Sequence, residues 1–223
     1  MSIVLQHEIE TLKKMVSSLG AHAEEAVQKA VTSVLERDAA LARSVIDFDP
    51  EIDQMEVDVE EECLKILALH QPVATDLRFI IATLKVNNDL ERVGDLAANI
   101  AQQGLYLAEL AEPEGLGAPF DVRGMTGTVQ SMLRESLDAL IHMDPELARH
   151  VRETDDRVDL INRNMYAHVQ MAIREHPDRV QPLIWLMRVS NNLERIADHA
   201  TNVAEDVIYM VEGTIIRHTN GRE

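Results

Sequence analysis

Four pairs of acidic residues share one spacing, and they are the residues of this chain best suited to chemistry. The second acid of each pair follows the first at i+4, so both lie on one face of a helix, one turn apart. The eight residues are Asp49, Asp53, Glu91, Asp95, Asp155, Asp159, Glu194 and Asp198. Like charges at this spacing repel each other unless something offsets them. Carboxylate oxygens are hard ligands, so this pattern favours a site for Mg²⁺, Ca²⁺, Mn²⁺ or iron.

Asparagines extend two of these pairs into a polar stripe. At about 100° per residue, the asparagines fall on the same helix face as the acids beside them. They are Asn88 and Asn99 around Glu91/Asp95, and Asn191 and Asn202 around Glu194/Asp198. Arg92 and Arg195 lie beside the stripe, and we expect them to pair with the carboxylates rather than to contact a phosphate-bearing ligand. The alternative for the whole stripe is a solvated face, because apolar residues occupy the opposite side of the helix.

These acids belong to an internal repeat. Leu84–Ala101 and Met187–Ala204 are identical at half of their aligned positions, including charged ones that packing alone does not require. Upstream, residues of Asp38–Asp53 match residues of Asp144–Asp159 at an offset three residues larger. We place this length difference in a turn, where insertions and deletions are tolerated. The sequence therefore predicts one duplicated supersecondary unit.

The composition favours helices. Aromatic residues make up only 3%, with nine Gly and seven Pro in 223 residues, which disfavours sheets. The predicted long helices are 3–36, 50–70 and 75–110 in the first half, and 122–142, 155–176 and 178–212 in the second. Short pieces are expected near 38–47 and 144–153. Pro50 suits a helix start, whereas Gln71-Pro72 and His176-Pro177 are expected to end helices.

Short connections make neighbouring helices antiparallel. We therefore predict an all-α fold of two tandem antiparallel three-helix bundles, related by internal duplication. The first covers 1–112 and the second 122–223, with a linker at 113–121 inside a segment that contains Gly and Pro.

Antiparallel hairpins would bring the acidic pairs together. Around the turn at Pro72, Asp53 comes level with Glu91, and Asp49 with Asp95. Around His176-Pro177, Asp159 comes level with Glu194, and Asp155 with Asp198. Four carboxylates would then converge in each half, as in bundles that build metal centres from facing helices. His199 follows Asp198 but points to another face, and its counterpart is Leu96, so we do not expect it to be a duplicated ligand.

Charge and composition exclude several classes of function. A formal charge of −18 argues against binding nucleic acid or an anionic membrane and suits basic protein surfaces or cations. Cys63, the only cysteine, cannot form an intramolecular disulfide and fits a reducing compartment. We expect neither a signal peptide nor a membrane-spanning helix. No phosphate-binding loop or nucleophile elbow is present, and no Glu-x-x-His motif follows the acids, which weakens a di-iron oxidase.

The assembled motifs resemble the PhoU family. The resemblance rests on DPEID at Asp49–Asp53, NNDLERVGD at Asn87–Asp95 and NNLERIAD at Asn191–Asp198. The family's E/D-x-x-x-D signature maps to Glu91/Asp95 and Glu194/Asp198. The resemblance implies metal clusters, often iron, on these motifs, with Asp49/Asp53 and Asp155/Asp159 as upstream partners. The second copy has Asp156 where the first has Pro50, which suggests a shifted helix start and a less well-formed second site.

The resemblance also implies a function. PhoU-like proteins are cytoplasmic, non-enzymatic negative regulators of phosphate uptake and of the phosphate-starvation response, and many form homodimers. They are thought to act as adaptors between the ATPase of a phosphate transporter and a sensor histidine kinase. The alternatives are a carboxylate-bridged metalloenzyme and a metal-storage helical protein.

Overall fold

The computed structural model describes residues 3–110 and 119–213, and all regular structure in these ranges is helical. The first half contains α1 (Ile3–Glu36), α2 (Ala39–His70) and α3 (Ala74–Glu109). The second contains α4 (Val122–His142), α5 (Pro145–Glu175), the short 3₁₀ helix η1 (Pro177–Arg179) and α6 (Val180–Glu212). The all-α prediction is therefore confirmed. Most of the predicted linker, residues 113–118, lies outside the described residues.

Aspartates fix where three of the helices begin. The Asp38 carboxylate accepts hydrogen bonds from the backbone N–H groups of Ala40 and Leu41, both at 2.9 Å. Asp121 and Asp144 cap α4 and α5 in the same way. Each cap satisfies N–H groups that have no partner inside the helix, which stabilises the helix start by about 1 kcal/mol.

Helix α2 continues through Pro50, so the prediction of a helix start there is wrong. Helix α5 likewise runs unbroken from Pro145, so the short pieces near 38–47 and 144–153 are the first turns of long helices. Because the caps at Asp38 and Asp144 set both starts, Asp156 in place of a proline does not shift the start of α5. The predicted helix ends are confirmed: α2 stops before Gln71-Pro72 and α5 before His176-Pro177.

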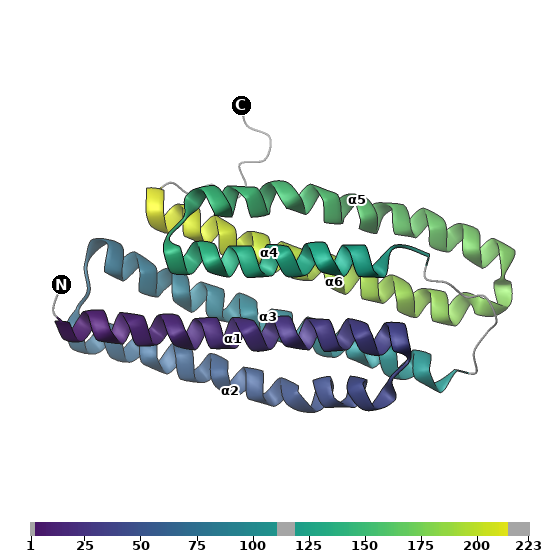
Figure 1. Ribbon diagram of the computed structural model, residues 1–223, viewed down its shortest axis with the longest axis horizontal. Helices are drawn as coiled ribbons and strands as arrows, with labels where there is room; N and C mark the ends of the chain where they lie inside the picture. The colour runs from purple at the N-terminus through teal and green to yellow at the C-terminus, as the bar shows by residue number, and fades with distance from the viewer. Residues whose placement is uncertain (1–2, 111–118, 214–223) are drawn as a thin grey trace.

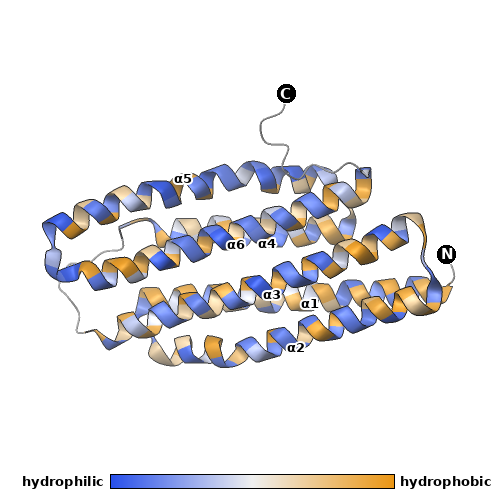
Figure 2. Ribbon diagram, turned by 180° about the vertical axis from the view of Figure 1, so that it is seen from behind, coloured by the Kyte–Doolittle hydropathy of each residue, from blue (hydrophilic) through white to orange (hydrophobic). Residues whose placement is uncertain are grey.

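The two bundles lie side by side rather than apart (Figure 1). Helix α3 packs against α1 and α2 in its own bundle and also against α6 of the other bundle. Apolar faces, visible as orange stretches along the helices in Figure 2, meet in one core that includes Leu90 and Ile100 of α3 and Leu193 of α6. The duplicated units therefore share a hydrophobic interior. In the described part of the chain, no helix is both long and apolar enough to span a bilayer.

Polar contacts line the seam between α3 and α6. Arg78 Nε donates to the backbone oxygen of Met210 at 2.8 Å. Lys85 Nζ lies 3.2 Å from the carboxylate of Asp206, a residue that is 1% exposed. Further along, the Tyr106 ring stacks on the Trp185 ring. Residue numbers rise along α3 as they fall along α6, so the two helices are antiparallel.

Candidate carboxylate sites

The predicted partners in the first bundle come together. Asp49 and Asp53 lie on α2, and Glu91 and Asp95 on α3. Partial burial raises the pKa of the Asp49 carboxyl, and the charges of Asp53 and Asp95 raise it further. Burial likewise raises the pKa of Glu91, with added repulsion from Asp95 and Asp53. The four acids are therefore close enough to oppose each other's ionisation.

A glycine allows the two helices to approach closely at this site. A Cβ atom at Gly94 would lie only 3.0 Å from Ile52 Cγ2 and 3.5 Å from Asp49 Oδ1. Gly94 stands between Glu91 and Asp95 on α3, so α2 packs against bare backbone there. The missing side chain at Gly94 thus allows the acidic faces of α2 and α3 to lie close together.

The second bundle repeats this arrangement with stronger electrostatic strain. Burial raises the pKa of Asp155 to about 6, and the charges of Asp198 and Asp159 contribute to the shift. The pKa values of Glu194 and Asp198 are raised first by burial and then by neighbouring carboxylates, including Asp159 in both cases. The expectation of a less well-formed second cluster therefore has no support in the helix geometry or in the electrostatics.

The carboxylates of each cluster lie near one another, but they are not arranged around a common point. Among the residues that the structure describes, no group of three or more His, Cys, Asp or Glu side chains is arranged to hold a metal ion. The donor chemistry nevertheless suits a hard cation, because clustered carboxylates supply oxygen ligands and unmet negative charge. Metal binding by these eight residues stays a prediction that requires their side chains to rearrange.

In the first cluster Arg92 pairs with the carboxylates, as predicted. Its guanidinium lies 3.2 Å from Glu91 Oε2 and 2.7 Å from Asp95 Oδ2. In the second cluster, Arg163 Nη2 lies 2.9 Å from Asp159. Arg195 forms no ion pair with a described residue, although its charge partly counteracts the raised pKa values of Glu194 and Asp198. The two clusters therefore differ in where their nearest positive charge lies.

The asparagines of the polar stripe do not all face the acids. Asn88 and Asn99 are exposed on α3. Asn191 accepts a hydrogen bond from the Tyr166 hydroxyl at 3.0 Å. Asn202 donates to Asp89 across the seam at 3.4 Å. The stripe is therefore partly solvated and partly used for contacts between helices.

Sequence reasoning missed Glu56 and its partner Asn87. Asn87 is fully buried and donates to the Glu56 backbone oxygen at 2.8 Å and to its carboxylate at 3.0 Å. Burial raises the pKa of Glu56, and Glu60 and Asp53 add to it. The numbers of Glu56 and Asn87 average close to Pro72, so the hairpin rule could have found this contact. The equivalent position in the second bundle pairs Ser190 with Asn162, which adds no charge.

His199 also has a role that the sequence did not reveal. Its Nδ1 lies 2.8 Å from the Asp89 carboxylate on α3. It therefore faces the other bundle, in line with the prediction that it points away from the acidic stripe. The absence of a His at the duplicated position, Leu96, reflects a contact made only once at the seam.

Comparison with known proteins identifies the family. The PhoU domain model matches residues 16–104 and 122–207, which together cover most of the chain in two copies. This chain belongs to the PhoU family. It is 40% identical, over 95% of its length and 86% of the relative, to a phosphate-specific transport system accessory protein PhoU homolog of Pseudomonas aeruginosa. A homolog of the same description from Aquifex aeolicus is 38% identical over 97% of this chain and 96% of its own.

Solved PhoU structures share the fold. The crystal structure of PhoU from Pseudomonas aeruginosa superposes with a TM-score of 0.88 at 37% identity, covering 94% of this chain and 99% of that one. The phosphate transport system regulatory protein PhoU from Streptococcus pneumoniae gives 0.84 at 27% identity, covering 95% and 99%. The duplicated three-helix architecture is therefore that of the PhoU family.

Proposed function

We propose that this protein is a non-enzymatic accessory protein of a phosphate-specific transport system. The observation that carries the proposal is the match, over nearly the whole chain, to relatives named for that role. A relative described as a regulatory protein has the same fold. In this role the protein restrains phosphate uptake and the phosphate-starvation response from the cytoplasm. It acts as an adaptor between the transporter ATPase and a sensor histidine kinase.

The shape and charge of the molecule support an adaptor. Long helices lie on both sides of the α3–α6 seam, α1 and α2 on one side and α4 and α5 on the other (Figure 1). A net charge of −18 favours basic partners. Binding of the full chain to the transporter ATPase subunit, and to the cytoplasmic region of the kinase, tests this role. Association with at least one of them is expected at low salt. Absence of binding to both, with and without added metal, would contradict the adaptor role.

The same proposal includes metal at the carboxylate clusters. Asp49, Asp53, Glu91 and Asp95 would hold a divalent or iron ion in the first bundle, and Asp155, Asp159, Glu194 and Asp198 in the second. A bound cation would supply positive charge that offsets the repulsion among the acids. Because it would bind the folded state, it is expected to raise the melting temperature.

Metal binding can be tested one cluster at a time. Metal analysis of the purified protein, and thermal melts with Mn²⁺ or Fe²⁺ against EDTA, are compared for the wild type, Asp49→Asn/Asp53→Asn and Asp155→Asn/Asp159→Asn. Each double variant is expected to lose the metal of its own bundle and to keep the other. If the wild type neither retains metal nor melts higher with added metal, the clusters are charge clusters only.

A metalloenzyme or metal store is the competing class. Relatives described as accessory and regulatory proteins support the non-enzymatic role. Oxidase and phosphatase assays on metal-loaded protein distinguish the classes, and turnover abolished by the Asp155→Asn/Asp159→Asn variant would favour an enzyme. Metal loading without any change in phosphate signalling after gene deletion would favour storage.

A further inference from the structure

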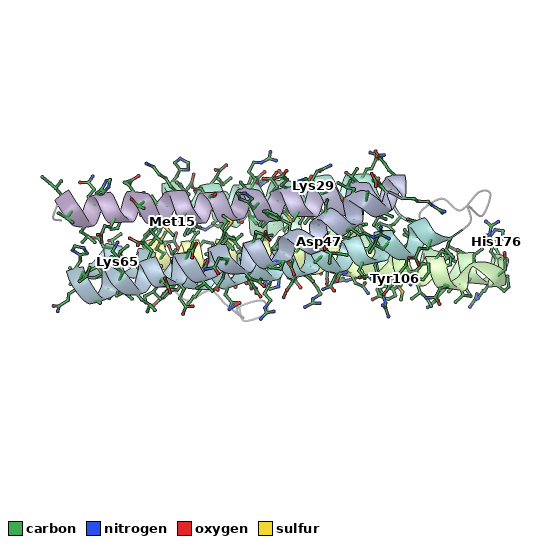
Figure 3. The ribbon with its side chains drawn as sticks, turned by 90° about the horizontal axis from the view of Figure 1, so that it is seen from below. Met15, Lys29, Asp47, Lys65, Tyr106 and His176 are labelled. Carbon is green, nitrogen blue, oxygen red and sulfur yellow. The ribbon has the colours of Figure 1, made fainter. Side chains whose placement is uncertain are left out.

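The outward side of α2 carries two exposed apolar side chains within an acidic surface. Val57 is 41% exposed and Leu64 is 53% exposed. They lie one heptad apart, so they fall on one stripe of the helix. The surrounding acids are also exposed. We call this surface the α2 outer face, formed by Glu51, Val57, Asp58, Glu60, Glu61 and Leu64; Figure 3 labels Asp47 and Lys65, which stand just beyond its ends on α2.

No positive charge balances the α2 outer face. The sequence between Arg43 and Lys65 contains no Lys, Arg or His. Within the described part of the chain, no ion pair reaches Glu51, Asp58, Glu60 or Glu61. Asp58 accepts a hydrogen bond from the neutral side chain of Gln54 at 2.9 Å. Among the described residues, no ion pair therefore offsets the repulsion between these four acids.

The duplicated helix shows that the bundle itself does not require such a face. Helix α5 occupies the equivalent place in the second bundle, yet it interleaves its acids with arginines, among them Arg152, Arg157 and Arg163. One of these pairs with Asp159 on the helix surface. The fold tolerates mixed charge at this place, so the purely acidic surface of α2 is a property of one half only.

Acidic flanks around an apolar seam define the chemistry of a complement. An amphipathic helix that packs along α2 would bury Val57 and Leu64 in its own apolar stripe, as in a coiled coil. Lysines or arginines at its edges would meet Asp58, Glu60 and Glu61. A second copy placed symmetrically on this face would bring like charges together, and an anionic membrane would be repelled.

We propose that the α2 outer face binds a basic amphipathic helix of a partner protein. The inference rests on the proposed adaptor function, since it names the surface by which one of the two adaptor partners docks. Opposite charge steers the partner toward the face, and burial of the two apolar side chains then slows its dissociation.

The test compares two α2 variants with a matched α5 control. The first variant, Asp58→Asn/Glu60→Gln/Glu61→Gln, removes charge, and the second, Val57→Ser/Leu64→Ser, removes the apolar stripe. The control is Leu160→Ser, which removes an apolar side chain of similar exposure, 58%, from α5. Dissociation constants for the transporter ATPase subunit and the kinase cytoplasmic region are measured with each full-length chain, after far-UV circular dichroism shows that each is folded.

For one of the two partners, both α2 variants are expected to raise the dissociation constant at least about tenfold, and the control to change it less than about twofold. The amide variant should also lose much of the wild type's salt dependence between about 0.05 and 0.3 M. If the wild type binds a partner and both variants bind it equally well, the inference is wrong and the adaptor function stands. If the wild type binds neither, both fail.

Two other occupants would overturn the proposal. If sedimentation velocity shows that the α2 variants lose self-association present in the wild type, the face belongs to a second copy. If the wild type binds vesicles containing anionic lipid and the α2 variants do not, the face belongs to a membrane surface.

Discussion

Individual carboxylates of the two clusters lie where ionisation is unfavourable. Asp155 is the clearest case, because burial raises its pKa to about 6 and nearby Asp198 and Asp159 add repulsion. The pKa of its counterpart Asp49 is also raised first by burial and then by two neighbouring carboxylates, Asp53 and Asp95. Both copies of the repeat therefore place an aspartate where its ionisation costs free energy. Such perturbed groups mark candidate functional sites.

Replacing Asp155 with Asn is expected to stabilise the metal-free protein at neutral pH. The pKa of Asp155 in the folded protein lies above the ordinary aspartate value of 3.8, so ionisation opposes folding. This cost is absent below about pH 4, grows as the pH rises through about 6, and is fully present at higher pH. In EDTA, Asp155→Asn should therefore melt about 2–4 °C above the wild type at pH 7.5 and show no difference near pH 4.

Glu175→Gln at the exposed end of α5 is the control for this measurement. It removes a carboxylate far from the cluster and is expected to move the melting temperature by less than about 1 °C at either pH. A lower melting temperature for Asp155→Asn than for the wild type at pH 7.5 would show that the ionised Asp155 stabilises the fold.

At the scale of elements, hydrophobic period and turn chemistry placed the long helices, except for the starts of α2 and α5. The sequence correctly predicts helix ends before Pro72 and Pro177, since the residue before proline avoids the helical region. It also brings Asp53 level with Glu91, which the shared electrostatics support. Pro50 misled the prediction, because a proline can start a helix or sit inside one. Only tertiary packing of α2 against α1 and α3 decides between these outcomes.

Pro50→Ala is expected to stabilise the protein by about 1–2 kcal/mol. Alanine restores the backbone N–H that Pro50 lacks inside α2 and removes the ring clash with the preceding turn. The greater freedom of alanine in the unfolded chain offsets part of this gain. Urea unfolding should show a higher midpoint with an unchanged m-value. Asp156→Ala, at the repeat-related position of α5, is the control and should change the stability by less than about 0.5 kcal/mol.

The contacts between the two halves lie beyond what the sequence could predict. Helical periodicity identifies an apolar face on α3, but it does not say that the face serves α6 as well as α1 and α2. His199 illustrates the limit, because its partner Asp89 is distant in sequence and the duplicated position is Leu96. The prediction of two bundles in tandem is correct for their order along the chain. In space, however, the halves form one body around a common core.

This shared core predicts that the two halves unfold together. Trp185, the only tryptophan, stacks on Tyr106 at the α3–α6 seam and reports on the contact between bundles. Its fluorescence and the far-UV circular dichroism should therefore give one coincident urea transition. Leu193→Ala truncates a fully buried α6 side chain and should lower the unfolding free energy by about 2–5 kcal/mol. The urea midpoints from fluorescence and from circular dichroism should fall by the same amount. Residues 1–112 alone should not fold stably, because the α3 surface that packs against α6 would be exposed to water. A fluorescence transition that precedes the loss of helix would show instead that the bundles separate before either one unfolds.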